Sequence, residues 1–346
     1  MFSEMLLSLL VACFDPLPVP AGQCALTTTL KMHTEDGATI ALHHHPGRGR
    51  PVLLVHGVSS NYRFFDLDAE HSLAVWLAAR DHDVWLLDLR GHGAALDDLA
   101  GDRQFYGWTL DDYGKHDVAT AVNWIKAVTG APKIDYVGHS MGGMVGTIYA
   151  QSGGEANLST FVALGSPAEF DPNDPLARLG SAALRSGGSA LLWVESPAFS
   201  AITADLGGRV PGRPQELLYN PQNFAATTID RMLRAVVSPM SRDEMRHLGN
   251  MLARGRFESA DGTVDYRAGL SDLRVPTLAI GGAGDQIVPS ARVRPYATAV
   301  AGEAKWIEAG TATGMDADYG HLDLGLGERA PDEIFPEIAA WLSAHP

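Results

Sequence analysis

The sequence is poor in cysteine and in basic residues, and it contains no long hydrophobic run. Its 346 residues include only two cysteines, Cys13 and Cys24, and two thiols cannot hold together a fold of this size. The formal net charge is −15 and no basic run stands out, which argues against nucleic acid as a partner. Stability must therefore come from a hydrophobic core, for which 46% of apolar residues provide the material.

The apolar stretch near the N-terminus, MLLSLLVACF at residues 5–14, is too short to span a bilayer. Two interpretations of it are open. The letters LVAC at residues 10–13 resemble a lipoprotein processing box, which would mean export. However, the preceding residues include Glu4 and no Lys or Arg, whereas export signals carry positive charge there. We therefore favour the interpretation that this segment is a helix that is not cleaved and packs on the rest of the protein, and that the protein is cytoplasmic.

Short apolar strands alternate with helical segments along most of the chain. The predicted elements are a hairpin turning at Asp36-Gly37, strands at 51–55, 83–88, 134–137, 160–167, 276–282 and 304–310, and helices near 72–80, 109–130, 289–300 and from 331 onward. Such alternation predicts a mostly parallel sheet with helices on both faces. The sequence therefore predicts an α/β fold with an N-terminal hairpin.

The alternation is interrupted between residues 168 and 272. This stretch has no comparable strand, but it has helical patterns, such as a capping box at Ser241 and Glu244. Because its composition is not of low complexity, it is an inserted helical cap rather than a linker; we call it the insertion. The predicted parts are an apolar segment (1–25), a core (26–167 and 273–346) and the insertion (168–272).

Residues 138–142, Gly-His-Ser-Met-Gly, place Ser140 between two glycines at the end of a predicted strand. In the G-x-S-x-G elbow the serine occupies a strained turn between a strand and a helix, where side chains two positions away would collide with backbone. The start of the following helix also directs its dipole and free N–H groups at the serine. This setting predicts that Ser140 is a nucleophile.

A serine hydroxyl needs a base, and in this architecture the chain order is serine, acid, histidine. His321 follows the last predicted strand and is the expected base, whereas His247 lies in the insertion and His345 is next to the C-terminus. Asp285 directly follows the strand 276–282 and is the expected acid, which would hold the imidazole in the right tautomer.

The sequence also contains competing candidates for the acid, none of which directly follows a predicted strand. They are Asp171, Asp316, Asp318 and Asp323.

An oxyanion needs two preorganised N–H donors. We expect these from the backbone of Met141, directly after the nucleophile, and of Val58, in the loop after strand 51–55. His56 precedes this donor and is expected to be structural.

No cofactor or metal site is predicted. The run at residues 43–45 consists of three histidines, but neighbouring strand residues point to opposite faces, so we expect a surface strand rather than a metal site. The sequence Arg90-Gly91-His92-Gly93 follows a strand, yet it lacks the lysine and serine of a phosphate-binding loop.

The order His56-Gly57, Gly138–Gly142, Asp285 and His321 resembles that of the α/β-hydrolases. Longer tracts resemble the acid (gastric and lysosomal) lipases, at residues 56–65, 72–91, 109–143 and 319–342. The resemblance implies that Ser140, His321 and Asp285 are nucleophile, base and acid, with Val58 and Met141 as oxyanion donors. The insertion resembles that family only in its position and helical character.

Two positions depart from the lipase pattern. Met141 stands where the family has glutamine, and His92 stands where the family has asparagine after Arg90-Gly91. The backbone donor survives either change, so the departures affect substrate preference rather than chemistry. The insertion also lacks cysteine, so a lipase-like lid is not implied.

We therefore expect a serine esterase or lipase that acts on small-molecule or lipid esters through an acyl-enzyme and contacts a lipid surface. Apolar residues of the insertion, with Trp193 and Met245 as candidates, would bind medium or long acyl chains. One alternative is an acyltransferase or polyester synthase-like enzyme, although those synthases use cysteine as nucleophile. Another is a non-catalytic protein that binds an acyl ligand, although such proteins tend to lose a triad member.

Overall fold

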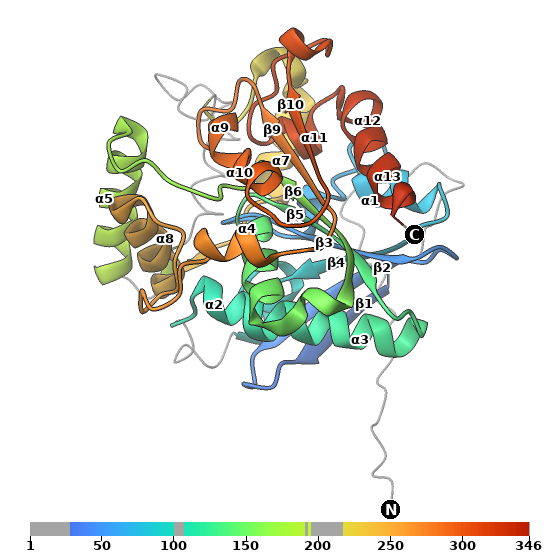
Figure 1. The fold of residues 1–346 in the computed structure, drawn as a ribbon, viewed down its shortest axis with the longest axis horizontal. Coiled ribbons are helices and arrows are strands. Elements are labelled where there is room, and N and C mark those ends of the chain that lie inside the picture. The colour runs from blue at the N-terminus through green and yellow to red at the C-terminus, as the bar shows by residue number, and fades with distance from the viewer. Residues whose placement is uncertain (1–27, 100–106, 191–192, 195–216, 346) are drawn as a thin grey trace, which may run out of the picture.

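A single eight-stranded sheet forms the centre of the computed structural model, which describes residues 28–99, 107–190, 193–194 and 217–345 (Figure 1). The strand order is β1-β2-β4-β3-β5-β6-β9-β10. The strands are β1 (Thr28–His33), β2 (Thr39–His45), β3 (Pro51–Val55), β4 (Asp83–Asp88), β5 (Ile134–His139), β6 (Leu158–Leu164), β9 (Thr277–Gly282) and β10 (Ala304–Ala309). Every pair from β4 to β10 is parallel, and β1 and β2 form an antiparallel hairpin at one edge. The predicted α/β fold is confirmed.

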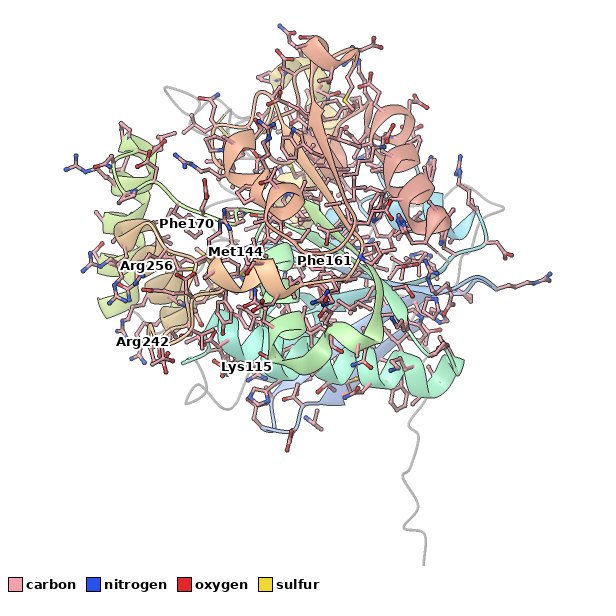
Figure 2. All side chains as sticks on the ribbon, in the orientation of Figure 1. Lys115, Met144, Phe161, Phe170, Arg242 and Arg256 are labelled. Atoms are coloured by element: carbon pink, nitrogen blue, oxygen red, sulfur yellow. The ribbon has the colours of Figure 1, made fainter. Side chains whose placement is uncertain are left out.

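Each parallel strand buries side chains on both faces of the sheet. On β3, Leu53 and Val55 belong to one hydrophobic cluster, and Val52 and Leu54 belong to the other, because successive side chains of a strand point to opposite faces. Met144 of a covering helix and Phe161 of β6, both labelled in Figure 2, belong to the first cluster. Strands buried on both faces must read as continuous apolar runs, which is the pattern that predicted them.

Helices cover both faces. The first cluster receives residues of α3 (Ala119–Thr129), α4 (Met141–Tyr149) and α10 (Pro295–Thr298), and the second receives α1 (Leu73–Ala78), α12 (Ala330–Glu333) and α13 (Phe335–Ala344). The remaining helices of the core are α2 (Leu110–Asp112), which continues into α3 through a π-helical turn at Tyr113–Val118, together with α9 (Ser290–Val293) and α11 (Asp323–Leu326).

The described part of the insertion is built around three helices, α5 (Pro175–Ala190), α7 (Ala226–Ala235) and α8 (Arg242–Arg254). Helices α5 and α8 pack on each other at one side of the core (Figure 1). The predicted capping box is present, because Ser241 Oγ accepts from Glu244 N and Glu244 accepts from Ser241 N.

The insertion also contains strands, which its sequence did not predict. The antiparallel pair β7 (Trp193–Val194) and β8 (Met240–Ser241) is only two residues long on each side, too short for a periodic pattern. The single helix predicted at 289–300 is likewise wrong. The structure has two short helices, α9 and α10, and the second begins at Pro295, which cannot donate a backbone hydrogen bond within a continuous helix.

The expectation that histidines 43–45 lie on a surface strand is also wrong. Strand β2 lies inside the sheet, between β1 and β4, and the side chains of His43 and His45 are buried. Each histidine bonds a different carboxylate, at 2.9 Å for His43–Asp88, 2.7 Å for His44–Asp83 and 2.9 Å for His45–Asp66. The three rings therefore support separate parts of the fold and do not converge on a metal.

The predicted N-terminal helix and Cys13 lie outside the described residues. Within the described ranges, none of the helices combines the length and apolar character that crossing a bilayer requires.

Candidate active site

Ser140 occupies the sharp turn between β5 and α4. It has φ 52° and ψ −119°, a conformation that side-chain-bearing residues rarely adopt. The flanking glycines allow this turn. A Cβ on Gly138 would lie 2.4 Å from the carbonyl carbon of Gly142, and a Cβ on Gly142 would lie 2.2 Å from the carbonyl oxygen of Val55. Neither distance is compatible with a side chain, so both glycines are required by close backbone approach.

Three side chains predicted from separate parts of the chain meet at this turn. His321 Nε2 lies 2.9 Å from Ser140 Oγ, and His321 Nδ1 lies 2.7 Å from Asp285 Oδ2. Because a carboxylate accepts, Nδ1 carries the proton and Nε2 offers its lone pair to the serine hydroxyl. The arrangement allows His321 to take the proton of Ser140 while Asp285 fixes the tautomer.

The loop after β9 fixes Asp285. Its Oδ1 accepts from the backbone N–H groups of Ile287 at 2.9 Å and Val288 at 2.8 Å. The other oxygen, Oδ2, is thereby directed at His321. The side chains of Asp285, His321 and Ser140 are all nearly buried, with 5%, 4% and 7% of the residue exposed, so their hydrogen bonds are largely protected from competing water.

His139, next to the serine, supports the loop that carries His321. Its ring stacks on Phe64, with 3.9 Å between the ring centroids, and its Nε2 lies 3.1 Å from the carbonyl oxygen of His321. Burial, with the neighbouring His321, lowers the pKa of His139 well below its usual value, so the ring is neutral and Nε2–H donates. The sequence pattern leaves this position unspecified, and nothing in it indicates this contact.

The loop 56–61, between β3 and the turn at Tyr62, lies against the nucleophile. A Cβ on Gly57 would approach the Cβ of Ser140 to 3.1 Å, so the loop and the serine are in contact. Val58 follows directly and is 36% exposed. On the other side of Ser140, Met141 is the first residue of α4, and a first-turn N–H has no acceptor within its own helix.

His56 supports this loop from within. The ring is fully buried, its Nδ1 lies 2.8 Å from the carbonyl oxygen of Gly57, and its Nε2 accepts from the N–H of Leu89 at 3.3 Å. Burial, with the nearby His92, lowers the pKa of His56 to about 3. His56 is therefore a neutral structural group rather than a proton carrier.

Asp323, one of the competing acids, contacts the insertion and not the imidazole of His321. It is fully buried and accepts from the backbone N–H of Asn220 at 3.0 Å and from Asn223 Nδ2 at 3.3 Å. The N–H of Leu322 donates to the carbonyl oxygen of Leu218 at 2.8 Å. The segment 218–223 of the insertion thus holds the loop that carries His321, a role that sequence order alone could not indicate.

A second buried polar contact joins the insertion to the core. Glu244 is fully buried, and its Oε2 accepts from the hydroxyl of Tyr113 at 3.0 Å. Its Oε1 lies 3.8 Å from Nε2 of His92, and within the described residues neither atom has a hydrogen-bond partner. Since Nδ1 of His92 donates to the carbonyl oxygen of Arg90, Nε2 is an acceptor. At 3.8 Å the two atoms are too far apart for a hydrogen bond, so a proton on Glu244 Oε1 would act by removing a buried charge that faces an unprotonated nitrogen.

The direction of both pKa shifts agrees with a neutral pair. Burial raises the pKa of Glu244 to about 7 and lowers the pKa of His92 to about 4. The raised pKa of Glu244 stabilises the fold fully below its unfolded value of 4.5, and this contribution is lost as pH rises from there to about 7. The lowered pKa of His92 acts in the opposite sense, so its contribution is present above 6.5 and lost as pH falls toward 4.

Glu244→Gln is expected to stabilise the protein at pH 8 relative to the parent, and to change little at pH 5. Glutamine cannot ionise, and its amide can donate toward His92 Nε2. The gain at pH 8 should reach roughly 3 kcal/mol, or several degrees in melting temperature. Thermal melts at pH 5, 6.5 and 8 measure it. The control Asp243→Asn changes a partly exposed carboxyl group on the same helix and should give a constant difference. A gap between Glu244→Gln and parent that does not widen with pH contradicts the neutral pair.

The candidate acyl-binding residues fall on two elements of the insertion, the short strand β7 and the helix α8. The backbone of Trp193 pairs with Ser241 in β7–β8, and its side chain lies outside what the structure describes. Met245 is 3% exposed on α8. Two other methionines of the insertion are core residues, since Met232 and Met251 belong to the two hydrophobic clusters.

One other group of carboxylates and a histidine lies close together in the part of the chain that the structure describes. Within the described ranges, Asp36, Asp112 and His116 are the group close enough to share a metal ion. However, both oxygens of Asp36 bond the guanidinium of Arg90, and Asp112 Oδ2 accepts from the N–H and hydroxyl of Thr109. These two carboxylates therefore form an ion pair and a helix cap.

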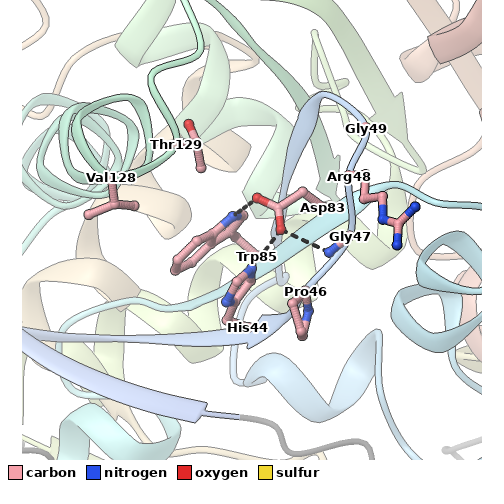
Figure 3. A pocket seen from close by; sticks show the side chains of 9 residues that line it. All are labelled: His44, Pro46, Gly47, Arg48, Gly49, Asp83, Trp85, Val128 and Thr129. Carbon is pink, nitrogen blue, oxygen red and sulfur yellow. Dashed lines mark hydrogen bonds and ion pairs between the residues drawn. The ribbon is translucent and has the colours of Figure 1, made fainter.

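A hollow lies at the opposite end of the sheet, and polar groups that line it are bonded to one another. It is lined by His44, Trp85 and Asp83, at the beginning of β4 (Figure 3). The two rings stack with 3.7 Å between centroids, and Asp83 accepts from His44, Trp85 and the N–H of Gly47. The site around Ser140 lies at the carboxyl ends of the parallel strands, where ligands of open α/β sheets bind.

Two lipases are among the known proteins that this chain is similar to. Human lipase member K is 24% identical over 344 residues, which cover 88% of this chain and 84% of that lipase. Rat gastric triacylglycerol lipase is 31% identical over 128 residues, covering 33% of this chain and 32% of the lipase. The expected likeness to the acid lipases is confirmed by these relatives.

Solved structures agree on the fold. An esterase from Thermogutta terrifontis superposes with a TM-score of 0.62 at 21% identity, covering 92% of this chain and 100% of that one. An esterase from Exiguobacterium antarcticum gives a TM-score of 0.61 at 17% identity, over 90% and 98% of the two chains. The model of the α/β hydrolase fold family matches residues 50–325. The chain belongs to the α/β-hydrolase family.

Proposed function

We propose that the protein hydrolyses carboxylic esters through an acyl-enzyme formed on Ser140. The observation that carries this proposal is the continuous chain of hydrogen bonds from Asp285 through His321 to Ser140, at a strained elbow in an α/β-hydrolase fold. Relatives named as lipases and structural neighbours named as esterases support the same reaction class.

In the first half of the reaction, Ser140 Oγ attacks the ester carbonyl while its proton passes to His321 Nε2. The tetrahedral oxyanion is bound by the backbone N–H groups of Met141 and Val58. His321 then protonates the leaving alcohol, and the C–O bond of the ester breaks. In the second half, His321 deprotonates a water molecule, which attacks the acyl carbon and releases the acid.

The contacts around the site support each of these proposed roles. Asp285 keeps the proton of His321 on Nδ1 and stabilises the imidazolium that forms. The elbow holds Ser140 at the beginning of α4, where the helix dipole favours negative charge. Since the proposed donors are backbone groups, one at the beginning of α4 and one in the loop against Ser140, little reorganisation is needed when the oxyanion forms.

We also propose that the insertion binds the acyl chain and favours medium or long chains over acetate. It enters the core between β6 and β9, beside the strand ends that carry Ser140 and Asp285. Trp193 and Met245 are the candidate contacts. Each additional buried methylene would contribute roughly 0.8 kcal/mol until the pocket is filled.

The test is kcat/KM for p-nitrophenyl esters from acetate to palmitate. The parent should hydrolyse the series, with kcat/KM rising from acetate to medium chains by about fourfold per methylene at most. Trp193→Ala and Met245→Ala should flatten that rise. The control Leu179→Ala removes an apolar side chain of the insertion that is 69% exposed, and it should leave the profile unchanged.

Two outcomes count against these proposals. No hydrolysis of any ester, together with no labelling by a fluorophosphonate, would reject the ester hydrolase. Hydrolysis with a flat or falling series that neither substitution changes would reject the acyl-binding role of the insertion and leave the reaction itself standing.

A further inference from the structure

Ser59, in the loop 56–61, has an unusual backbone conformation. Its φ is 51°, and within the described residues the other non-glycine residues with positive φ are Asp81 and Ser140. Side chains disfavour this region, so a residue persists there only where surrounding contacts fix it. Ser59 directly follows Val58, the proposed oxyanion donor.

The contacts that fix Ser59 come from the insertion. Ser59 Oγ donates to the carbonyl oxygen of Ser238 at 2.7 Å, and the N–H of Ser238 donates back to the carbonyl oxygen of Ser59 at 3.0 Å. Ser238 lies between α7 and β8 and is 3% exposed. This reciprocal pair joins residues that are 179 positions apart in the chain.

Further bonds surround this pair. Ser238 Oγ accepts from Asn61 Nδ2 at 3.1 Å and from the N–H of Gly93 at 3.2 Å. Asn61 Nδ2 also donates to the carbonyl oxygen of Ala235 at 3.0 Å. The loop 56–61 is therefore bound to the insertion at both Ser59 and Asn61, while on its other side Gly57 lies against Ser140.

We propose that Ser59 is a positioning residue that fixes the direction of the Val58 N–H through its bonds to Ser238. This inference rests on the proposed ester hydrolysis. The contact of Gly57 with Ser140 fixes one end of this part of the loop, and the bonds of Ser59 to Ser238 fix the other. The Val58 peptide between them is therefore held in one orientation. An oxyanion donor is effective because it is oriented before charge develops, and here the insertion supplies part of that orientation.

The test uses Ser59→Ala in the full-length protein. Alanine keeps Cβ and removes the hydroxyl that donates to Ser238. We expect kcat to fall about tenfold with KM changed less than twofold, since loss of a whole oxyanion donor lowers kcat by roughly 10² to 10³. Affinity for an alkyl boronic acid, which forms a tetrahedral adduct with serine, should fall by the same factor as kcat/KM. The midpoint of the pH profile of kcat/KM should not move.

Asp81→Ala is the matched control. It changes the other non-nucleophilic residue with positive φ, in the turn before β4 at the opposite end of the sheet. It should alter neither kcat/KM nor boronic acid affinity. If Ser59→Ala does not fold, Ser59→Gly provides the same measurement. Glycine also lacks the hydroxyl that donates to Ser238, and it accepts the positive φ without strain, so it should lower kcat and boronic acid affinity together.

The outcomes separate this inference from the proposed function. A parent enzyme without esterase activity and without fluorophosphonate labelling overturns both. An active parent with Ser59→Ala within twofold of its kcat overturns only the role of Ser59. A tenfold loss of kcat/KM with unchanged boronic acid affinity also overturns it, because the hydroxyl would then act on something other than the oxyanion donors.

Discussion

Ser140→Ala is expected to lower ester hydrolysis by a factor on the order of 10⁴ or more, leaving only the residual rate that binding and the oxyanion donors provide. The substitution removes the hydroxyl that His321 Nε2 accepts from. The fold should persist, because alanine can replace serine at this turn without adding atoms. Steady-state hydrolysis of the best p-nitrophenyl ester measures the loss, and a thermal melt checks the fold.

Ser290→Ala serves as the comparison. Ser290 begins α9, and its hydroxyl donates to Glu308 of β10, away from the triad. It should retain the parent rate. A fluorophosphonate should label the parent on the peptide that contains Ser140, and label Ser140→Ala not at all. Retention of even a tenth of the parent rate by Ser140→Ala would show that another group is the nucleophile.

Asp285→Asn should cost about 10⁴ in kcat, as the equivalent change does in serine proteases. The asparagine amide can donate to His321 Nδ1, which places the imidazole proton on Nε2. That nitrogen then has no lone pair for the hydroxyl of Ser140, although the geometry is almost unchanged. The measurement is kcat for the same ester.

Asp323→Asn distinguishes the acid from its neighbour in the loop. Asp323 contacts Asn220 and Asn223, so its amide variant should lose far less activity than Asp285→Asn. The reverse ranking, with a large loss at Asp323 and none at Asp285, would exchange the two roles.

The sequence predicted those parts of the fold that have a local or periodic signature. Strands buried on both faces, such as β3 and β5, produce continuous apolar runs, and the elbow at Ser140 requires glycines at fixed positions. The order of Ser140, Asp285 and His321 then follows from the architecture. None of these requires knowledge of which distant side chains touch.

The features that sequence could not indicate depend on contacts between distant segments. The burial of His43 follows from β1 pairing outside β2, and the neutral pair of Glu244 and His92 exists only once the insertion docks on the core. Ser59 has no signature at all, because a serine in a polar loop is compatible with many conformations. Its positive φ becomes visible only in the structure.

The insertion contacts two loops of the proposed active site, through Asn220 at the loop of His321 and through Ser238 at the loop 56–61. This has a consequence for building chimeras between related hydrolases. Exchanging the whole insertion, residues 168–272, would also replace the groups that hold these two loops in place. A crossover that exchanges the other residues of the insertion, and retains residues 218–241 with the core, keeps the bonds of Asn220 and Ser238 to the two loops.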